Sequence, residues 1–210
     1  MTILDYSRLA DTPLTADPFP HVVVSRFVPQ EALEAVVADL PALDRRGSFP
    51  MGSLRLGPAA AALTEELEGQ ALRQAIAAKF GLDLDDAPTM LTLRGCSTER
   101  DGHIHRDSAA KRVTVLLYLN PATAAWARHE GCLRLLRRRD DLEDFAVEVP
   151  PIDGTLLVFP NSEDTWHGHR TFIGRRYVVQ LNYMTTDAAA RSELRRHRLS
   201  AFVKRLTLAA

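Results

Sequence analysis

Two stretches far apart in the sequence carry the residue types of a metal site. His105 and Asp107 form a His-x-Asp pair, and His167 lies in a later His-Gly-His stretch. Side chains two apart on an extended strand or its edge point the same way, so His105 and Asp107 can bind one ion. With His167 they would form a set of two histidines and one carboxylate, which leaves coordination positions open and favours non-haem Fe(II). The spacing therefore predicts a catalytic iron site.

A cationic residue follows His167 at the start of an apolar run. Arg176 stands nine positions after His167 and opens the run 176–183. A guanidinium in such a place can bind a carboxylate through two parallel hydrogen bonds. The arrangement predicts a ligand with a carboxylate beside the metal.

The composition limits the range of partners and locations. The 210 residues include 26 Lys plus Arg and 27 Asp plus Glu, for a net charge of -1. This balance does not indicate nucleic acid or an acidic membrane surface. Cys96 and Cys132 are the only cysteines, which favours a reducing compartment. Without a signal-peptide pattern or a long apolar run, we expect a cytoplasmic protein, and the sequence predicts no oligomeric state.

Helices are expected in the first part of the chain. Residues 1–18 read as a polar arm, 19–24 as a strand, and 45–57 as a long loop without periodicity. Apolar residues recur at helical spacing over 30–40 and from Pro58 onward. Gly81 would end the second helical stretch, which is one helix or two broken near Gly69.

From Pro88 the pattern changes to short strands separated by turn formers. The expected strands cover 89–94, 112–119, 132–136, 146–149, 155–159, 165–170 and 176–183. A last helix is expected over about 188–206, with Leu194, Leu199, Phe202, Val203 and Leu206 on its apolar side. We therefore expect one domain over 1–210, mainly β with flanking helices. Residues 1–88 would be helical support, 89–186 a sandwich, jelly-roll or barrel core, and 187–210 the C-terminal helix.

Several sequence blocks carry a family resemblance. They are His105-Arg106-Asp107, the run 113–120, Trp126 with 130–135, the run 154–159, and the stretch from His167 to Tyr177. Together they resemble the double-stranded β-helix, a jelly-roll and cupin-like fold, of the 2-oxoglutarate- and Fe(II)-dependent dioxygenases, and most of all the prolyl-hydroxylase-like branch. The chain departs from that pattern at 94–96, where relatives commonly carry a tyrosine, and at Cys132, where a second glycine is usual.

The resemblance implies roles for individual residues. His105, Asp107 and His167 would bind Fe(II), and Arg176 would pair with the distal carboxylate of 2-oxoglutarate. Tyr118 would donate a hydrogen bond to the same carboxylate. Thr114 shares a strand face with Tyr118 and is assigned to the co-substrate as well. O2 would be the second co-substrate, and ascorbate a supporting reductant.

Neighbouring residues leave alternatives for these roles. His103 could replace His105 but has no carboxylate two positions later, and His169 could replace His167 but lacks the family spacing to Arg176. Arg175 could replace Arg176 and is disfavoured by the same spacing. The candidate substrate pocket contains His169, Gln180, Asn182, Arg94 and His103. Alternatively, the amides of Gln180 and Asn182 line a wet cavity without touching substrate.

The implied reaction is hydroxylation of an unactivated C–H bond, with release of succinate and CO2. The expected substrate is small and polar, such as an amino acid or a derivative; a prolyl or other residue within a protein is the alternative. Desaturation or cyclisation would use the same chemistry. A metal-binding jelly-roll module without turnover and a zinc hydrolase are the rivals from other classes. Arg176 and Tyr118 argue against a module, since a structural metal needs no carboxylate clamp.

Overall fold

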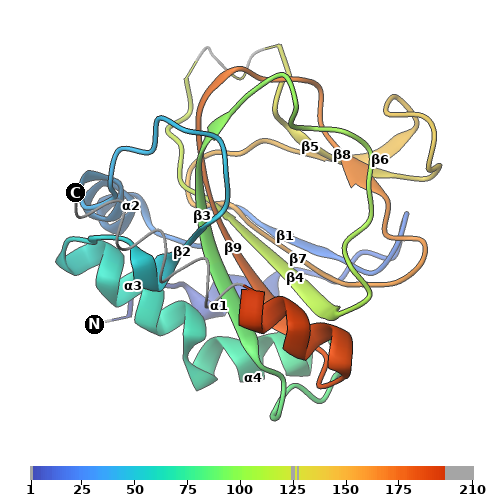
Figure 1. The fold of residues 1–210 in the computed structure, drawn as a ribbon, viewed down its shortest axis with the longest axis horizontal. Helices are drawn as coiled ribbons and strands as arrows, with labels where there is room; N and C mark the ends of the chain where they lie inside the picture. Colours follow the sequence, from blue (N-terminus) through green and yellow to red (C-terminus); the bar gives the residue numbers. More distant parts are fainter. Residues whose placement is uncertain (1, 124–125, 127, 197–210) are drawn as a thin grey trace.

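Two antiparallel sheets face each other, and helices cover the larger one (Figure 1). The computed structural model describes all residues except 1, 124–125, 127 and 197–210. The larger sheet has six strands in the order β1-β7-β4-β9-β3-β2, and the smaller has three in the order β6-β5-β8. This arrangement is consistent with a jelly roll and confirms the mainly β fold with flanking helices.

The larger sheet has two buried faces. Its strands are β1 (Val22–Val24), β2 (Phe49–Pro50), β3 (Thr89–Ser97), β4 (Lys111–Tyr118), β7 (Leu156–Pro160) and β9 (Gly174–Met184). Residues of β4 alternate between the faces, as the pleat requires: Val113, Val115 and Leu117 pack toward the helices, while Leu116 and Tyr118 pack toward the small sheet. Because both faces are covered, these strands contain runs of apolar residues with only a few polar positions.

The helices pack on the outer face of this sheet. They are α1 (Tyr6–Asp11), α2 (Gln30–Ala38), α3 (Pro58–Glu68) and α4 (Gln70–Phe80). Gly69 separates α3 from α4, so the two-helix alternative is the right one, and Gly81 ends α4 in the left-handed conformation with φ 64°. The helices contribute buried apolar side chains to the core, among them Leu33, Val36, Leu63, Leu67, Leu72 and Ile76.

The small sheet closes the other side of the core. It consists of β5 (Leu133–Leu136), β6 (Phe145–Val149) and β8 (His167–Gly168). The expected strand over 165–170 shrinks to two residues. On one side β8 pairs with β5 at only two positions, and on the other side it makes a single bridge to His105. Backbone pairing therefore includes only His167 and Gly168 of the strand expected over 165–170.

Two expectations about local structure need correction, and a third falls partly outside the described residues. The arm 1–18 contains α1, whose N-terminus is capped by the Asp5 side chain and whose Leu9 is buried. The loop 45–57 contains β2 and a 3-10 turn, η1 (Met51–Ser53). Residues 188–196 are helical, and Leu194 packs against Ala110, Met184 and Ala190. The other expected apolar positions of that helix lie outside the described residues. Within the part of the chain that is described, no helix combines the length and apolar character needed to cross a membrane.

Candidate active site

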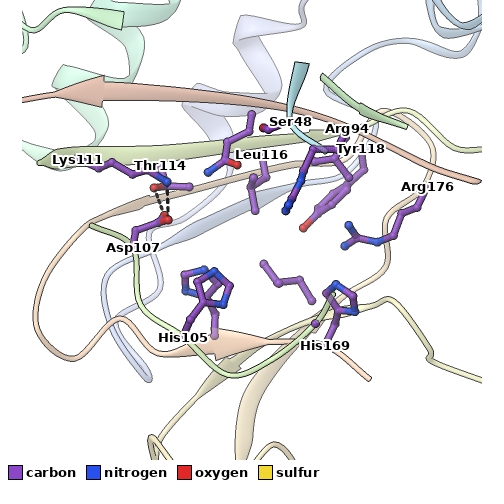
Figure 2. A pocket seen from close by; sticks show the side chains of 15 residues that line it. Ser48, Arg94, His105, Asp107, Lys111, Thr114, Leu116, Tyr118, His169 and Arg176 are labelled. Carbon is purple, nitrogen blue, oxygen red and sulfur yellow. Dashed lines mark hydrogen bonds and ion pairs between the residues drawn. The ribbon is translucent and has the colours of Figure 1, made fainter. Parts of the chain in front are cut away.

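A polar cavity lies between the two sheets, and Figure 2 shows its lining. Its volume is about 280 Å³. Nine residues singled out from the sequence line it: Arg94, His105, Asp107, Thr114, Tyr118, His167, His169, Arg176 and Gln180. In Figure 2, His105 and Asp107 lie at one end, while Arg176 and His169 lie at the other. We call these the metal end and the clamp end.

The metal end brings together the three predicted ligands. One donor atom from each of His105, Asp107 and His167 lies within 4.8 Å of the others. His105 and His167 exchange two backbone hydrogen bonds, each 2.9 Å long, and their ring centroids are 4.4 Å apart. A bridge of this kind holds both imidazoles side by side, although His105 belongs to no strand.

Each histidine is oriented by a carbonyl group. His105 Nδ1 lies 2.9 Å from the carbonyl oxygen of His103, and His167 Nδ1 lies 2.9 Å from that of Thr165. A carbonyl only accepts hydrogen bonds, so each Nδ1 carries the proton and each Nε2 keeps its lone pair. Histidine ligands of metals are usually fixed in this way. Burial, and then the neighbouring His105, lower the pKa of His167 to about 4, so this imidazole is neutral at physiological pH.

Asp107 is held from both carboxylate oxygens. Lys111 Nζ lies 2.6 Å from Oδ1, and Thr114 Oγ1 donates to Oδ2 at 2.5 Å. Burial opposes ionisation of this carboxyl, but the Lys111 ammonium, His167 and these hydrogen bonds together keep the pKa of Asp107 below its ordinary value. The side chain is therefore a carboxylate, as a hard cation requires.

The clamp end presents hydrogen-bond donors to the cavity. Arg176, from β9, is buried, and its Nε donates to the carbonyl oxygen of Gly131 at 2.9 Å. Tyr118, the last residue of β4, is fully buried, and its hydroxyl has no hydrogen-bond partner among the described residues. Burial raises the pKa of Tyr118 to about 12, so the hydroxyl keeps its proton. A buried donor without a partner costs about 1–3 kcal/mol, so this end fits an anionic acceptor.

The structure distinguishes between neighbouring residues that the sequence left as alternatives for the same role. Arg176 faces the cavity, whereas Arg175 is exposed and lies 3.5 Å from Asp44. His103 is exposed and does not line the cavity; its carbonyl oxygen orients His105 instead. His169 lines the clamp end, where burial and then Arg176 lower its pKa to about 4.

Two other assigned residues have partners that the sequence did not indicate. Thr114 lines the cavity and donates to Asp107, so it lies at the metal end. It stands four residues, or roughly 13 Å along a strand, from Tyr118, and its contact with the co-substrate stays a prediction. Asn182 lies outside the cavity lining but accepts a hydrogen bond from Gln180 at 3.3 Å.

Sequence reasoning missed several lining residues. They are Ser48, Gly102, Lys111, Leu116, Leu133 and Val178. Lys111 has the clearest function, because its ammonium pairs with Asp107; its place four residues after the His-x-Asp pair was the available signal. Gly102 has φ 97° and would clash with His169 if it carried a Cβ. This close approach explains the glycine beside the first histidine pair.

Comparison with known proteins agrees with this geometry. Residues 93–184 match the model of the 2OG-Fe(II) oxygenase superfamily. A prolyl-4-hydroxylase from Pseudomonas putida aligns with a TM-score of 0.57 and 19% identity, over 86% of this chain and 91% of that one. A Trichoplax adhaerens prolyl hydroxylase, solved with a peptide fragment of hypoxia inducible factor, aligns at 0.56 and 19%, over 89% of each chain. A Phytophthora capsici prolyl 4-hydroxylase aligns at 0.59 and 16%, over 96% and 77%.

These matches indicate the class of the protein. No curated protein gives a significant sequence match. Residues 93–184 match the 2OG-Fe(II) oxygenase superfamily, and the prolyl hydroxylases share the fold of the chain. Together with the cluster of His105, Asp107 and His167, the family match supports a 2-oxoglutarate-dependent dioxygenase. Its cofactor is Fe(II), and its co-substrates are 2-oxoglutarate and O2.

Proposed function

We propose that this dioxygenase hydroxylates a C–H bond of an amino-acid unit held within a peptide or protein. The observation that carries the reaction type is the pairing of a two-histidine, one-carboxylate cluster with a buried Tyr118–Arg176 clamp in one cavity. Metal storage needs no such clamp, which argues against a binding module. We further propose that the two facing sheets form the double-stranded β-helix of this superfamily.

Each end of the cavity has a separate task. His105 and His167 would bind Fe(II) through Nε2, and Asp107 through a carboxylate oxygen. Arg176 and Tyr118 would bind the distal carboxylate of 2-oxoglutarate. When bound, iron and 2-oxoglutarate supply the oxidation, in which 2-oxoglutarate and O2 become succinate and CO2 and one oxygen atom enters the substrate.

Apolar side chains separate the two ends. Leu116, Leu133 and Val178 line the cavity between the metal ligands and the clamp. They exclude water from the middle of the site, which strengthens the charged contacts of the clamp. Thr114 and Lys111 fix the orientation of Asp107 from the strand side.

A groove beside the cavity supports the peptide substrate. It has a volume of about 390 Å³ and shares Ser48, Lys111 and Gln180 with the cavity. Its other lining residues are Pro50, Met90, Thr92, Asn182, Glu193 and Arg196. A free amino acid would not need this space, whereas residues flanking a reacting side chain would. The groove therefore favours the alternative that the sequence analysis ranked second.

A free small polar substrate remains the second candidate. The cavity lining is rich in polar side chains, and Arg94 and Gln180 stand near its mouth without belonging to either end. These two residues would suit the carboxylate and polar atoms of a free amino acid. Hydroxylation, desaturation and ring closure would all be compatible with this lining.

One experiment tests both the reaction and the substrate class. The protein is incubated with Fe(II), 2-oxoglutarate and ascorbate, either with pooled free amino acids or with desalted cell protein. Succinate and products carrying one added oxygen atom are measured by mass spectrometry. We expect iron-dependent succinate and oxidation in the protein fraction. Oxidation confined to free amino acids would overturn the peptide substrate, and no succinate under any condition would overturn the enzyme's proposed chemistry.

Domain extent and location also stay proposals. A single domain over 1–210 is supported by the larger sheet, which packs on the helices with one face and on the small sheet with the other. A cytoplasmic location is supported by Cys96 and Cys132, which form no disulfide. A net charge of -1 supports the absence of a nucleic-acid or membrane partner.

A further inference from the structure

A second group of metal-binding side chains lies outside the cavity. His129, Cys132 and Glu148 each offer one donor atom, and these atoms lie within 4.8 Å of one another, as in the iron triad. Cys132 directly precedes β5, and Glu148 lies on the neighbouring strand β6. None of the three lines the cavity between the sheets. The cluster is therefore a separate site with a different donor set, nitrogen, sulfur and oxygen.

Cys132 is a buried donor of this cluster. The residue is 2% exposed, and its sulfur lies within 4.8 Å of the donor atoms of His129 and Glu148. A coordinated thiol is held as the thiolate, so a divalent ion would compensate the negative charge of both the sulfur and the Glu148 carboxylate.

The carboxylate is already oriented for binding. Arg134 Nε lies 2.6 Å from Glu148 Oε2, which leaves Oε1 directed at His129, with whose Nδ1 it makes a short hydrogen bond. Arg134 would keep its contact with Oε2 if a metal took the place of that hydrogen bond between Oε1 and Nδ1. Partners that orient a ligand in this way are a usual part of metal sites.

The backbone holds His129 close to Cys132. His129 has φ 61° and Gly131 has φ 74°, and the Cys132 N–H donates to the His129 carbonyl at 3.4 Å. A positive φ is uncommon for a residue other than glycine and indicates that the turn is fixed by its surroundings. The turn therefore presents an imidazole and a thiol, three residues apart, toward Glu148.

We propose that His129, Cys132 and Glu148 form a second metal site, for a zinc-type divalent ion, with one coordination position left to water. Tetrahedral zinc takes these three donors at about 2.0–2.3 Å, so neighbouring donor atoms would close to roughly 3.5 Å. The site borders the clamp, because the carbonyl of Gly131, next to Cys132, accepts the hydrogen bond of Arg176. A metal there would fix the peptide that positions the clamp arginine. This inference does not depend on the proposed substrate or reaction.

Cobalt(II) is a probe that separates this site from the iron triad. The triad contains no sulfur, so a thiolate-to-cobalt charge-transfer band reports a cysteine ligand outside the triad. Cobalt is titrated into a His105→Ala/Asp107→Asn variant, in which the triad is disabled, and the absorption spectrum is recorded with the bound stoichiometry. We expect about one equivalent of bound cobalt with the sulfur band. Zinc should displace the cobalt and remove the band.

Two further changes in the same background test the assignment. Cys132→Ser should abolish the sulfur band, whereas Cys96→Ser, the matched control at the other cysteine, should leave it intact. His129→Ala should weaken cobalt binding at least tenfold. The His129 side chain is 63% exposed, so this variant should fold even if Cys132→Ser does not. Thermal unfolding of each variant checks this point.

The outcomes that would overturn the site are equally direct. Absence of the sulfur band at several equivalents of cobalt would exclude a thiolate ligand. A band that persists in Cys132→Ser, or disappears in Cys96→Ser, would show that Cys96 and not Cys132 supplies the sulfur ligand. Unchanged cobalt affinity in His129→Ala would show that His129 is not a ligand. Binding by Cys132 and Glu148 alone would contradict the proposed three-residue site.

Discussion

The two ends of the cavity are built from different kinds of structure. At the metal end, His105 belongs to no strand, Asp107 lies between strands, and His167 sits in the two-residue strand β8. At the clamp end, Tyr118 and Arg176 lie on β4 and β9, which pair with each other over most of their length. In Figure 2, His105 and Asp107 lie on one side of the cavity and Arg176 lies on the other.

Because of this difference, substitutions at the two ends should affect turnover and folding stability to different degrees. At the metal end the side chains depend on individual hydrogen bonds to backbone carbonyls, and His105 is exposed. At the clamp end the side chains are buried in the sheet core. A substitution at an exposed position costs little stability, whereas one in a packed core often costs several kcal/mol. Changes at His105 should therefore affect mainly turnover, and changes at the clamp end both turnover and folding.

The largest effect is expected at the metal end. His105→Ala removes one of the three predicted iron ligands, so succinate formation should fall more than 100-fold. Its melting temperature without metal should stay within a few degrees of the parent, because the side chain is exposed. His103→Ala is the control and should keep most activity, since only its backbone carbonyl takes part. Equal loss of activity in both variants would contradict the choice of His105 over His103 as the iron ligand.

The clamp end should respond in the co-substrate requirement. Arg176→Ala removes a charge-assisted contact worth roughly 2–5 kcal/mol in a desolvated site. The KM for 2-oxoglutarate should rise well over tenfold, and the melting temperature should fall because the Gly131 carbonyl loses its donor. Arg175→Ala, at the exposed neighbour, should change neither quantity. The reverse order of effects would move the clamp by one residue.

A substitution of Lys111 tests how the Asp107 carboxylate is stabilised when no metal is bound. Lys111→Met leaves a largely buried carboxylate without its cation, which costs about 3–5 kcal/mol in the metal-free protein. A bound metal supplies the missing positive charge, so the variant should gain more thermal stability on metal binding than the parent does. Thermal unfolding with and without Mn(II), and a Lys111→Arg control that keeps the charge, measure this. An identical metal-induced shift in parent and Lys111→Met would contradict the assignment.

Per group and per pH unit, the smallest effect is expected on acid stability, and it compares one histidine from each end. His167 and His169 both have a pKa lowered to about 4 by burial, below the value of an unfolded chain near 6.5. Between these values the unfolded chain binds protons that the folded metal-free protein does not. Stability should therefore decrease as pH falls from 6.5 to 4, by up to about 1.4 kcal/mol per pH unit for each group.

His169→Gln should remove about half of this pH dependence. Urea unfolding of the metal-free protein at several pH values in that range measures the slope. If the variant shows the same pH dependence of stability as the parent, His169 is not protected from protonation in the folded protein. His103→Ala again serves as the control, because His103 is exposed.

The sequence predicted the two ends of the site for different reasons. His105, Asp107 and His167 were found from residue type and spacing, although two of the three lie outside regular strands. Arg176 was predicted from its spacing after His167, and Tyr118 from the family resemblance; the alternation of β4 and β9, which are long and regular, agrees with both.

The parts that could not be predicted depend on side-chain contacts that leave no periodic pattern in the sequence. Thr114 was assigned to the co-substrate because it shares a face with Tyr118, and its hydrogen bond to Asp107, on a loop with no periodicity, was not foreseen. Lys111 was missed for the same reason. The α1 helix has only six residues, too few for an apolar period, and it is fixed by the Asp5 cap and the burial of Leu9.

The bridge between His105 and His167 has a consequence for local opening of the molecule. These two residues exchange a single pair of backbone hydrogen bonds at the margin of the small sheet. Without a metal, their amides should exchange with deuterated water through opening of this seam rather than through global unfolding. A metal bound across the seam must dissociate first, so at 100 times its dissociation constant it should slow that exchange about 100-fold. Iron would thus act as a reversible crosslink that determines how often the active site opens.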